Sequence, residues 1–419
     1  MRATDSSLTR FANNQVHQNV TERDLTVSVR VQSDRRYGLA STNDLSDNGL
    51  QRACDEALEL ARAFPNRADF IGLPESEPVP DLPGYNVSTA EFGPLQRAVA
   101  VRSICHKAHE RGLVAAGAFE VDVTGYTVAN SLGLVVHHAS TTAELITVVM
   151  SDDSSGHAAR LSINAEEIDA EAVADEAIGK ALEGRSPRSL GPGEYDVVLE
   201  EHAVSDMLDF LGYTGFGALS VQEGRSFMSG KLGSAVMGPN VSIRDDPLDP
   251  TGIPRPFDAE GIPARRVDLI VDGVAHSPVH DRRTAASEGT TSTGHALPSE
   301  VTLGPLPRNM FLEPGQSSKQ DLIRSVDRGL LITRFWYTRV VHPLSVHMTG
   351  MTRDGTFLIE NGEVVAPVRS LRFTESYLHA LGRVGGIGSD TRLVRDSFAT
   401  NRVPALKIDG WSFMGSSQQ

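Results

Sequence analysis

Cysteine is scarce in this chain of 419 residues, which holds only Cys54 and Cys105. The two form no CxxC pair, so the pattern that marks a structural zinc ribbon is absent. Both fall in segments with helical periodicity, where free cysteines are usually buried, and we expect two buried thiols. So few cysteines in so long a chain favour a reducing compartment, and we expect a cytoplasmic protein.

Long apolar segments are also lacking. No run of about 18 apolar residues occurs, and the N-terminus has no apolar core of a signal peptide. Acidic residues outnumber basic ones, 54 to 39, and the formal net charge is −15. An acidic surface opposes nonspecific binding to nucleic acid and to anionic lipid. We therefore expect neither nucleic acid nor a membrane among the partners.

Motifs for nucleophilic or phosphate chemistry are missing as well. The chain has no GxSxG and no GxxxxGK[ST]. The string GRVGGIG, residues 382–388, resembles a phosphate-binding loop only in its glycines. It follows a predicted helix and not a strand, and no dinucleotide-binding unit surrounds it. We interpret it as a flexible loop.

Histidines do not form a clear metal site in the sequence. The 13 give several close pairs, among them His106 and His109, His276 and His280, and His342 and His347. The first pair is helical but has no obvious third ligand. Pro278 lies inside the second pair and opposes the helix that would bring its imidazoles together. The third pair has an odd separation, which predicts opposite faces of a strand. We interpret all three pairs as surface or structural residues.

The segments that are present alternate between strands and helices. Leu25–Val31 alternates apolar and polar residues, as a half-buried strand does, and helical patterns follow. Gly184–Asp196 holds three glycines and two prolines and reads as a linker into a second half with long strands and few helices. We predict an α+β fold of two domains, residues 1–190 and 191–419, each with a mostly antiparallel or mixed sheet and a few helices.

The opening segment TRFANNQVHQN, Thr9–Asn19, is unusually polar for a strand. Phe11 and Val16 have opposite parity, so both can be buried only if a bulge lies near the two asparagines. Asn13, Asn14 and His17 can all hydrogen-bond to a peptide backbone. These side chains face either a polar cavity or solvent at a sheet edge, and the sequence leaves both alternatives open.

Several uncommon strings carry a resemblance to a known family. They include TRFANNQVHQN, NSLG, EYDVVLEEHAVSDMLDFL, KLG, IRDDP, STGHA, TGMTRDGTFLIENGEVVAPV and VPALKIDGWSFMG. In this order and at this spacing, the chain resembles the TldD/PmbA family, a two-component bacterial and archaeal peptidase system. The resemblance covers most of the chain. It implies a heterodimer in which a TldD-like subunit binds zinc through HExxxH and a downstream cysteine, whereas the PmbA- or TldE-like subunit lacks this motif.

The position of HExxxH separates the two branches. Here the first, second and sixth places hold Glu201, His202 and Asp206, so both metal imidazoles are replaced by carboxylates. No cysteine follows Cys105. Zinc peptidase sites need three protein ligands and an activated water. We therefore expect no catalytic residue and no metal on this chain, which resembles the non-metal branch, and we expect zinc on a TldD-like partner.

The resemblance implies that the chain forms part of a chamber for proteolysis of peptides or unfolded segments, including peptide natural-product maturation. Strands often hold extended peptides by strand addition, and aromatic and arginine residues favour interfaces. We expect substrate or partner contacts from the two asparagines and histidine of the opening segment and from later strands: Asn13, Asn14, His17, Arg334, Trp336, Tyr337, Arg339, Arg353 and Asp354.

Two alternatives stay open. The chain is a stand-alone metallopeptidase with an atypical site at Glu201, His202 and Asp206 or among the scattered histidines, or it is a binding or regulatory protein without peptidase activity. Family members usually carry a helix and a strand ahead of the TRFANN-like segment, which lies close to the start here. If those elements are absent, an edge of the first sheet is open for a partner to cover.

Overall fold

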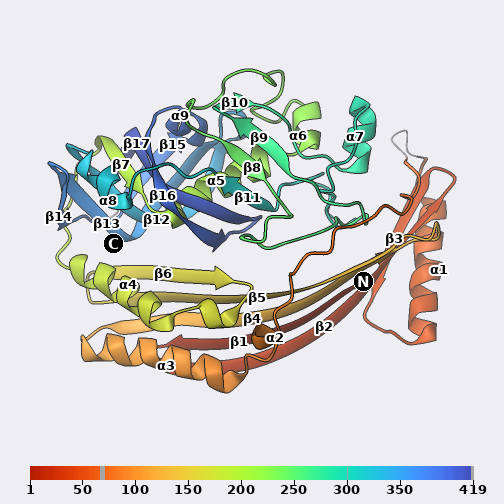
Figure 1. Ribbon diagram of the computed structural model, residues 1–419, viewed down its shortest axis with the longest axis horizontal. Helices are drawn as coiled ribbons and strands as arrows, with labels where there is room; N and C mark the ends of the chain where they lie inside the picture. Colours follow the sequence, from red (N-terminus) through yellow and green to blue (C-terminus); the bar gives the residue numbers. More distant parts are fainter. Residues whose placement is uncertain (67–70, 300, 417–419) are drawn as a thin grey trace.

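Two β-sheets form the framework of the chain in the computed structural model, which describes residues 1–66, 71–299 and 301–416. In Figure 1 the strands of the first half lie below those of the second half, α3 lies at the bottom, away from the second half, and α4 lies beside β6. Helices and strands are mixed within each half. This confirms the predicted α+β class.

The first sheet has six antiparallel strands in the order β3-β2-β1-β4-β5-β6. Its strands are β1 (Arg2–Ala12), β2 (Gln15–Ser33), β3 (Arg36–Thr42), β4 (Val114–Ala129), β5 (Val135–Met150) and β6 (Ser155–Ser162). The helices of this half are α1 (Asp47–Ala63), α2 (Val87–Ala90), α3 (Pro94–Glu110), the 3-10 turn η1 (Ala165–Glu167) and α4 (Ala170–Glu183).

The two faces of this sheet differ because successive side chains of a strand point to opposite sides. Odd-numbered residues of β4 and β5, such as Phe119 and Leu145, pack with apolar residues of α3 and α4 in one buried cluster. Even-numbered residues of the same strands, such as Asp122 and Thr142, line a cavity. The sheet is thus apolar beneath its helices and polar toward the second half.

The polar opening segment is a hairpin. Asn13 and Asn14 join β1 to β2, and both have a positive φ, 51° and 59°. Two such residues form the type of turn whose twist matches antiparallel strands, and asparagine tolerates this conformation. The single strand expected over Thr9–Asn19 is therefore wrong. The bulge expected at the asparagines lies instead between Arg10 and Phe11.

The second half contains eleven strands of one sheet. They are β7 (Gly193–Leu199), β8 (Ile243–Asp245), β9 (Val267–Val271), β10 (Val274–Ala275), β11 (Asn309–Leu312), β12 (Arg328–His342), β13 (His347–Glu360), β14 (Glu363–Pro367), β15 (Leu371–Ser376), β16 (Val384–Arg395) and β17 (Thr400–Ser416). The helices are α5 (Glu201–Gly215), α6 (Ala218–Gln222), α7 (Arg282–Glu288), α8 (Lys319–Arg324), the 3-10 turn η2 (Pro343–Ser345) and α9 (Tyr377–Leu381).

Five of these strands pair in a closed circle, β7-β12-β13-β15-β17, because β17 also pairs with β7. An aromatic cluster packs here: the ring centroid of Phe335 lies 4.6 Å from that of Phe373 and 5.3 Å from that of Trp411. Trp411 is fully buried. The circle provides a rigid support for β7 and for α5, which follows it directly.

Two sequence-based expectations in this half are wrong. Part of GRVGGIG belongs to β16, where Val384 pairs with Ile408 and Ile387 with Leu406, so it is not a flexible loop. Backbone pairing with β17 overrides the weak strand preference of glycine. His342 and His347 do not lie on opposite faces of one strand but face each other across the β12–β13 turn.

The thiols also differ from expectation. Cys105 on α3 is buried, but Cys54 on α1 is exposed. The buried side of α1 is formed by small residues that include Ala53 and Ala57. Cys54 follows Ala53 by about 100° around the helix, which turns its side chain outward.

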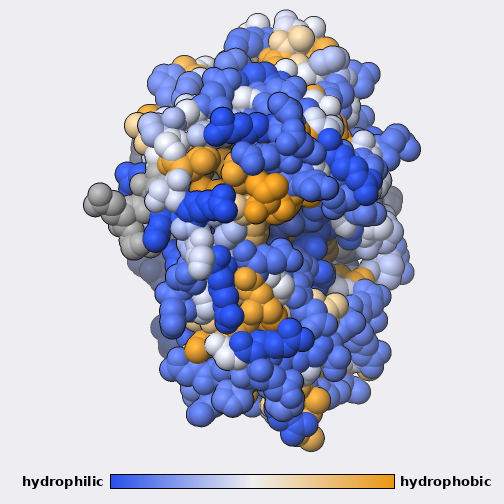
Figure 2. Space-filling view, turned by 90° about the vertical axis from the view of Figure 1, so that its left-hand side faces the viewer, coloured by the Kyte–Doolittle hydropathy of each residue, from blue (hydrophilic) through white to orange (hydrophobic). Residues whose placement is uncertain are grey.

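Polar residues dominate the face seen in Figure 2, where apolar residues gather in separate patches above and below the level at which the halves meet. Among the helices of the described residues, none is long and apolar enough to cross a membrane. The expected division at residues 190 and 191 falls just before β7. Its status as a boundary between two domains stays a prediction.

Candidate functional site

The helix that carries the degenerate motif begins at the contact between the halves. β7 runs into α5, and the backbone N–H of Glu200 donates to the carbonyl of Ile332 on β12. Glu200 and Glu201 are both buried at the first turn of α5. Two buried carboxylates in one turn require cationic partners.

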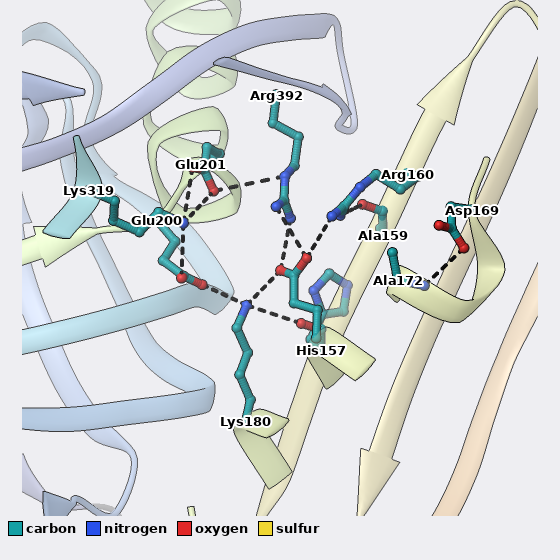
Figure 3. Close-up of polar contacts among 11 residues, drawn as sticks. His157, Ala159, Arg160, Asp169, Ala172, Lys180, Glu200, Glu201, Lys319 and Arg392 are labelled. Atoms are coloured by element: carbon teal, nitrogen blue, oxygen red, sulfur yellow. Dashed lines mark hydrogen bonds and ion pairs between the residues drawn. The ribbon is translucent and has the colours of Figure 1, made fainter. Parts of the chain in front are cut away.

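Cations from both halves supply those partners (Figure 3). Lys180 of α4 lies 2.7 Å from Glu200, and Lys319 of α8 lies 3.1 Å from both Glu200 and Glu201. Arg392 of β16 approaches Glu201 at 3.9 Å. Burial opposes ionisation of Glu200, but Lys180 and Lys319 hold its pKa below the usual value. The first motif position is therefore one member of an ion-pair network.

The network also joins the two halves through Glu176 of α4. Its carboxylate lies 3.0 Å from Arg392, 2.9 Å from Lys180 and 2.8 Å from Arg160. Despite partial burial, these cations hold the pKa of Glu176 well below its usual range. We call Arg160, Glu176, Lys180, Glu200, Glu201, Lys319 and Arg392 the interface network.

The second motif position, His202, contacts a histidine of the other half. Its ring centroid lies 4.7 Å from that of His157 on β6, edge to face. His202 Nε2 and His157 Nδ1 are buried and find no hydrogen-bond partner among the described residues. Burial and nearby cations, Arg392 and Lys180 for His202, lower the pKa of both imidazoles well below the usual value. Both rings are neutral near pH 7.

The third motif position, Asp206, accepts hydrogen bonds from Thr338 (2.7 Å) and Tyr377 (2.6 Å). Burial and the neighbouring Asp396 raise the pKa of Asp206 to about 7. Asp396 itself accepts a hydrogen bond from Ser205, and burial raises its pKa as well.

The carboxylate of Asp209, one turn further along α5, accepts from the backbone N–H groups of Phe398 and Ala399. Burial and Asp396 raise the pKa of Asp209. Three carboxyl groups, the buried Asp209 and the half-buried Asp206 and Asp396, thus lie close together beside α5.

These residues do not fit the zinc site of a metallopeptidase. The oxygens of Glu201 are held by ammonium and guanidinium groups, His202 packs against His157, and Asp206 is occupied by two hydroxyl donors. Positively charged side chains lie next to the first two motif positions, where a zinc ion would have to bind. No group of three His, Cys, Asp or Glu residues in the described part of the chain is arranged to hold a metal ion.

A cavity of about 540 Å³ lies between the halves. One wall is the polar face of β1, β4 and β5, and the other consists of loops of the second half. The strings IRDDP and STGHA meet at this wall: His295 Nε2 lies 2.6 Å from an oxygen of the buried Asp245, and Thr293 lies 2.9 Å from His295 Nδ1. Sequence reasoning noted both strings but did not single out Asp245 or His295, because the residues are 50 positions apart.

The structure brings four of the predicted contact residues together on β12 and β13. Arg334 is ion-paired with the buried Asp354, its Nε 2.7 Å from the carboxylate. Trp336 lies near two guanidinium groups, 5.1 Å from Arg334 and 4.6 Å from Arg353. Cation–π contacts of this kind hold an aromatic side chain in place.

Tyr337 and Arg339 follow on the same strand. The Arg339 guanidinium lies 4.4 Å from the ring of Tyr337. Tyr337 has a φ of 56° and interrupts the register between β12 and β13. Its side chain is 66% exposed and that of Trp336 is 42% exposed, so both present apolar surface to solvent.

The predicted contact residues of the first strands lie elsewhere. Asn14 accepts from the N–H of Ala115 (2.7 Å) and donates to the carbonyl of Leu113 (2.8 Å), which ties the hairpin to β4. Asn13 and His17 are exposed. None of the three lines the cavity between the halves.

Comparison with known proteins defines the class of this fold. Residues 192–415 match the family model described as PmbA/TldA metallopeptidase C-terminal domain, and residues 2–61 match PmbA/TldA metallopeptidase domain 1. The chain belongs to the TldD/PmbA family of metallopeptidases. This confirms the resemblance drawn from the sequence.

Three relatives illustrate the range of similarity. A metalloprotease of Methanothermobacter thermautotrophicus is 30% identical over 48% of this chain, and the match spans only 44% of that protein. The metalloprotease PmbA of Escherichia coli O157:H7 is 23% identical over 92% of this chain and 85% of its own length. The crystal structure of TldE from Thermococcus kodakarensis shares the fold with a TM-score of 0.90, at 20% identity, over 98% of this chain and 95% of that one.

Proposed function

We propose that this chain is the non-metal subunit of a heteromeric zinc peptidase of the TldD type. In this proposal a TldD-like partner supplies the zinc and the catalytic residues, and this chain completes the chamber that holds the substrate. The substrates are peptides or unfolded segments, including precursors of peptide natural products. The complex works in the cytoplasm and engages neither nucleic acid nor a membrane.

One observation carries the proposal: all three motif positions on α5 are engaged by other protein groups. Glu201 pairs with Lys319, His202 packs on His157, and Asp206 accepts from Tyr377. A zinc peptidase needs open coordination at such positions for a water molecule. A chain with the family fold but without this donor set is suited to act beside a metal-bearing subunit.

The strand β12 supports a contact with an extended peptide or with the partner. One edge of β12 pairs with β13 along most of its length, whereas β7 pairs with the other edge only at Gly329–Ile332. Beyond Ile332 that edge has no partner strand among the described residues. Backbone groups at a free edge can accept an added strand, and exposed Trp336 and Tyr337 lie on the same stretch.

The purified chain tests the proposal when it is studied alone. We expect substoichiometric zinc by elemental analysis and no cleavage of unstructured peptides. Stoichiometric zinc together with chelator-sensitive cleavage by the chain alone would establish the stand-alone metallopeptidase instead. A regulatory protein without a peptidase partner is indicated if no HExxxH-bearing homologue co-purifies from the source cells.

A further inference from the structure

Guanidinium groups gather at one end of the cavity between the halves. Arg2 of β1, Arg255 of the loop after β8 and Arg308 before β11 all line it. Arg255 is exposed to the cavity and Arg308 is half-buried. These side chains come from three separate parts of the chain, so the fold itself concentrates the charge.

None of these three side chains makes a hydrogen bond or a salt bridge to another described residue. Their closeness is costly: the positive charge of Arg308 and, to a smaller extent, that of Arg2 lower the pKa of Arg255 to about 9. Burial lowers the pKa of Arg308 too, although the carboxylate of Asp245 partly offsets this. Like charges held together without a directly paired carboxylate indicate a site that an anion completes.

The carboxylates of the cavity are mostly engaged elsewhere. Asp122 accepts from Ser6 (2.5 Å) and lies 3.4 Å from Arg395. Asp258 accepts backbone N–H groups at Ile262 and Ala296. The carboxylate of Asp396 accepts a hydrogen bond from Ser205. Burial and the neighbouring charge of Asp122 raise the pKa of Glu120. Arg395 is thereby paired, whereas the other three arginines are not.

The rest of the cavity suits a peptide. Its volume of about 540 Å³ lies within the roughly 300–1,000 Å³ of ligand sites. The rings of Tyr126 and Phe257 stack there, with centroids 5.9 Å apart, and give an apolar surface beside the arginines. The net charge of −15 on this chain opposes the binding of a polyanion. Small anionic groups are therefore the candidate ligands.

We propose that Arg255 and Arg308, assisted by Arg2, bind the carboxylate of a peptide held in this cavity, an assignment that rests on the proposed peptidase function. Guanidinium groups bind carboxylates through paired, charge-assisted hydrogen bonds. The favoured source is the C-terminal carboxylate, which would fix the end of an extended substrate. An acidic side chain offers the same chemistry, and the experiment separates the two.

Isothermal titration of the full chain with one tetrapeptide in three forms tests this inference. The forms are the free acid, the C-terminal amide, and an amide with one internal glutamate. Because one charge-assisted contact is replaced by a neutral one, we expect the free acid to bind roughly tenfold more tightly than the plain amide. Arg255→Gln and Arg308→Gln should each abolish this preference. Arg266→Gln, the same change at an exposed arginine paired with Asp268, should preserve it.

Thermal unfolding serves as the folding control, since relief of repulsion predicts no loss of melting temperature in Arg255→Gln. Tight binding of the glutamate amide but not of the plain amide would support a carboxylate site that reads side chains. Equal affinity for acid and plain amide, or a preference that survives both variants, overturns the carboxylate assignment and leaves the chamber proposal standing. Inorganic phosphate that binds as tightly as the free acid overturns the peptide assignment. If no form binds, the carboxylate assignment fails, and cleavage by this chain mixed with its HExxxH-bearing homologue decides the chamber proposal separately.

Discussion

At the scale of single residues, the helix α5 shows how side chains at metal-ligand positions take other roles. Glu201 is balanced by Lys319, and Asp206 by two hydroxyl donors. His202 stays neutral beside His157 because burial opposes its protonation. Each group either has a polar partner or is neutral, as polar groups away from water require. None of them needs a metal ion for this.

Asp206 provides a pH-dependent test at this scale. The pKa of Asp206 is about 7 in the folded protein, against an ordinary value of 3.8, so between about pH 4 and 7 the folded state holds a proton that the unfolded state has lost. Stability from this group is complete below about pH 4 and is lost as the pH rises to 7. Asp206→Asn resembles the protonated acid at every pH. Between pH 5 and 8 its free energy of unfolding should therefore fall by about 1–3 kcal/mol less than that of the original protein.

The measurement is urea unfolding at several pH values. The buried His157 and the half-buried His202 have the opposite effect, because their lowered pKa makes the unfolded state bind more protons below about pH 6.5. They act equally in both proteins. The exposed Asp390→Asn variant is the control and should parallel the original protein. Parallel curves for Asp206→Asn as well would show that Asp206 is ionised throughout.

At the scale of elements, the β1–β2 hairpin is fixed by its turn and by β4. Asn14 accepts and donates one hydrogen bond each to β4, and its φ is positive. We expect Asn14→Ala to lower the free energy of unfolding by about 1–3 kcal/mol, because two backbone groups lose their partners and alanine disfavours this conformation.

Chemical denaturation measures that loss, and His17→Ala, at an exposed neighbour, should leave stability unchanged. Peptide cleavage by the reconstituted pair should survive both changes, since neither residue lines the cavity. Loss of cleavage in a stable His17→Ala protein would instead assign the hairpin to the substrate path.

Local patterns predict the elements of this fold better than its spatial contacts. Pro94 begins a helix, Gly184 follows a helix end and Asn361–Gly362 forms a turn, and each acts through nearby backbone that a local sequence pattern can indicate. The Asn13–Asn14 turn was missed because a polar strand and a polar hairpin share one composition. The pairing of Asp245 with His295 depends on tertiary structure, which a single sequence does not display.

At the scale of the whole molecule, the interface network fastens one half to the other. Glu176 on α4 is central, because it contacts Arg392 of the second half as well as two cations of its own half. Removal of its charge takes away the carboxylate paired with Arg160 and the nearer carboxylate of Arg392. Lys180 keeps its ion pair with Glu200. The relative position of the halves, and so the shape of the cavity between them, depends on this contact.

Glu176→Gln should lower the free energy of unfolding by about 2–3 kcal/mol, less than for a fully buried pair, because its side chain is 20% exposed. Glu183→Gln, at an exposed position of the same helix, is the matched control and should have little effect. Urea unfolding followed separately in each half would also test the predicted division at residue 190, since weaker coupling should separate two transitions. A single unchanged transition in Glu176→Gln would contradict the fastening role.

The most direct measurement of the central claim is peptide cleavage by this chain mixed with its HExxxH-bearing homologue. We predict that neither protein cleaves alone, that the zinc-loaded mixture does, and that His202→Gln in this chain preserves the activity. Replacement of the glutamate in the homologue's HExxxH should abolish it. Full activity of this chain alone, lost on His202→Gln, would contradict the account and assign catalysis to α5.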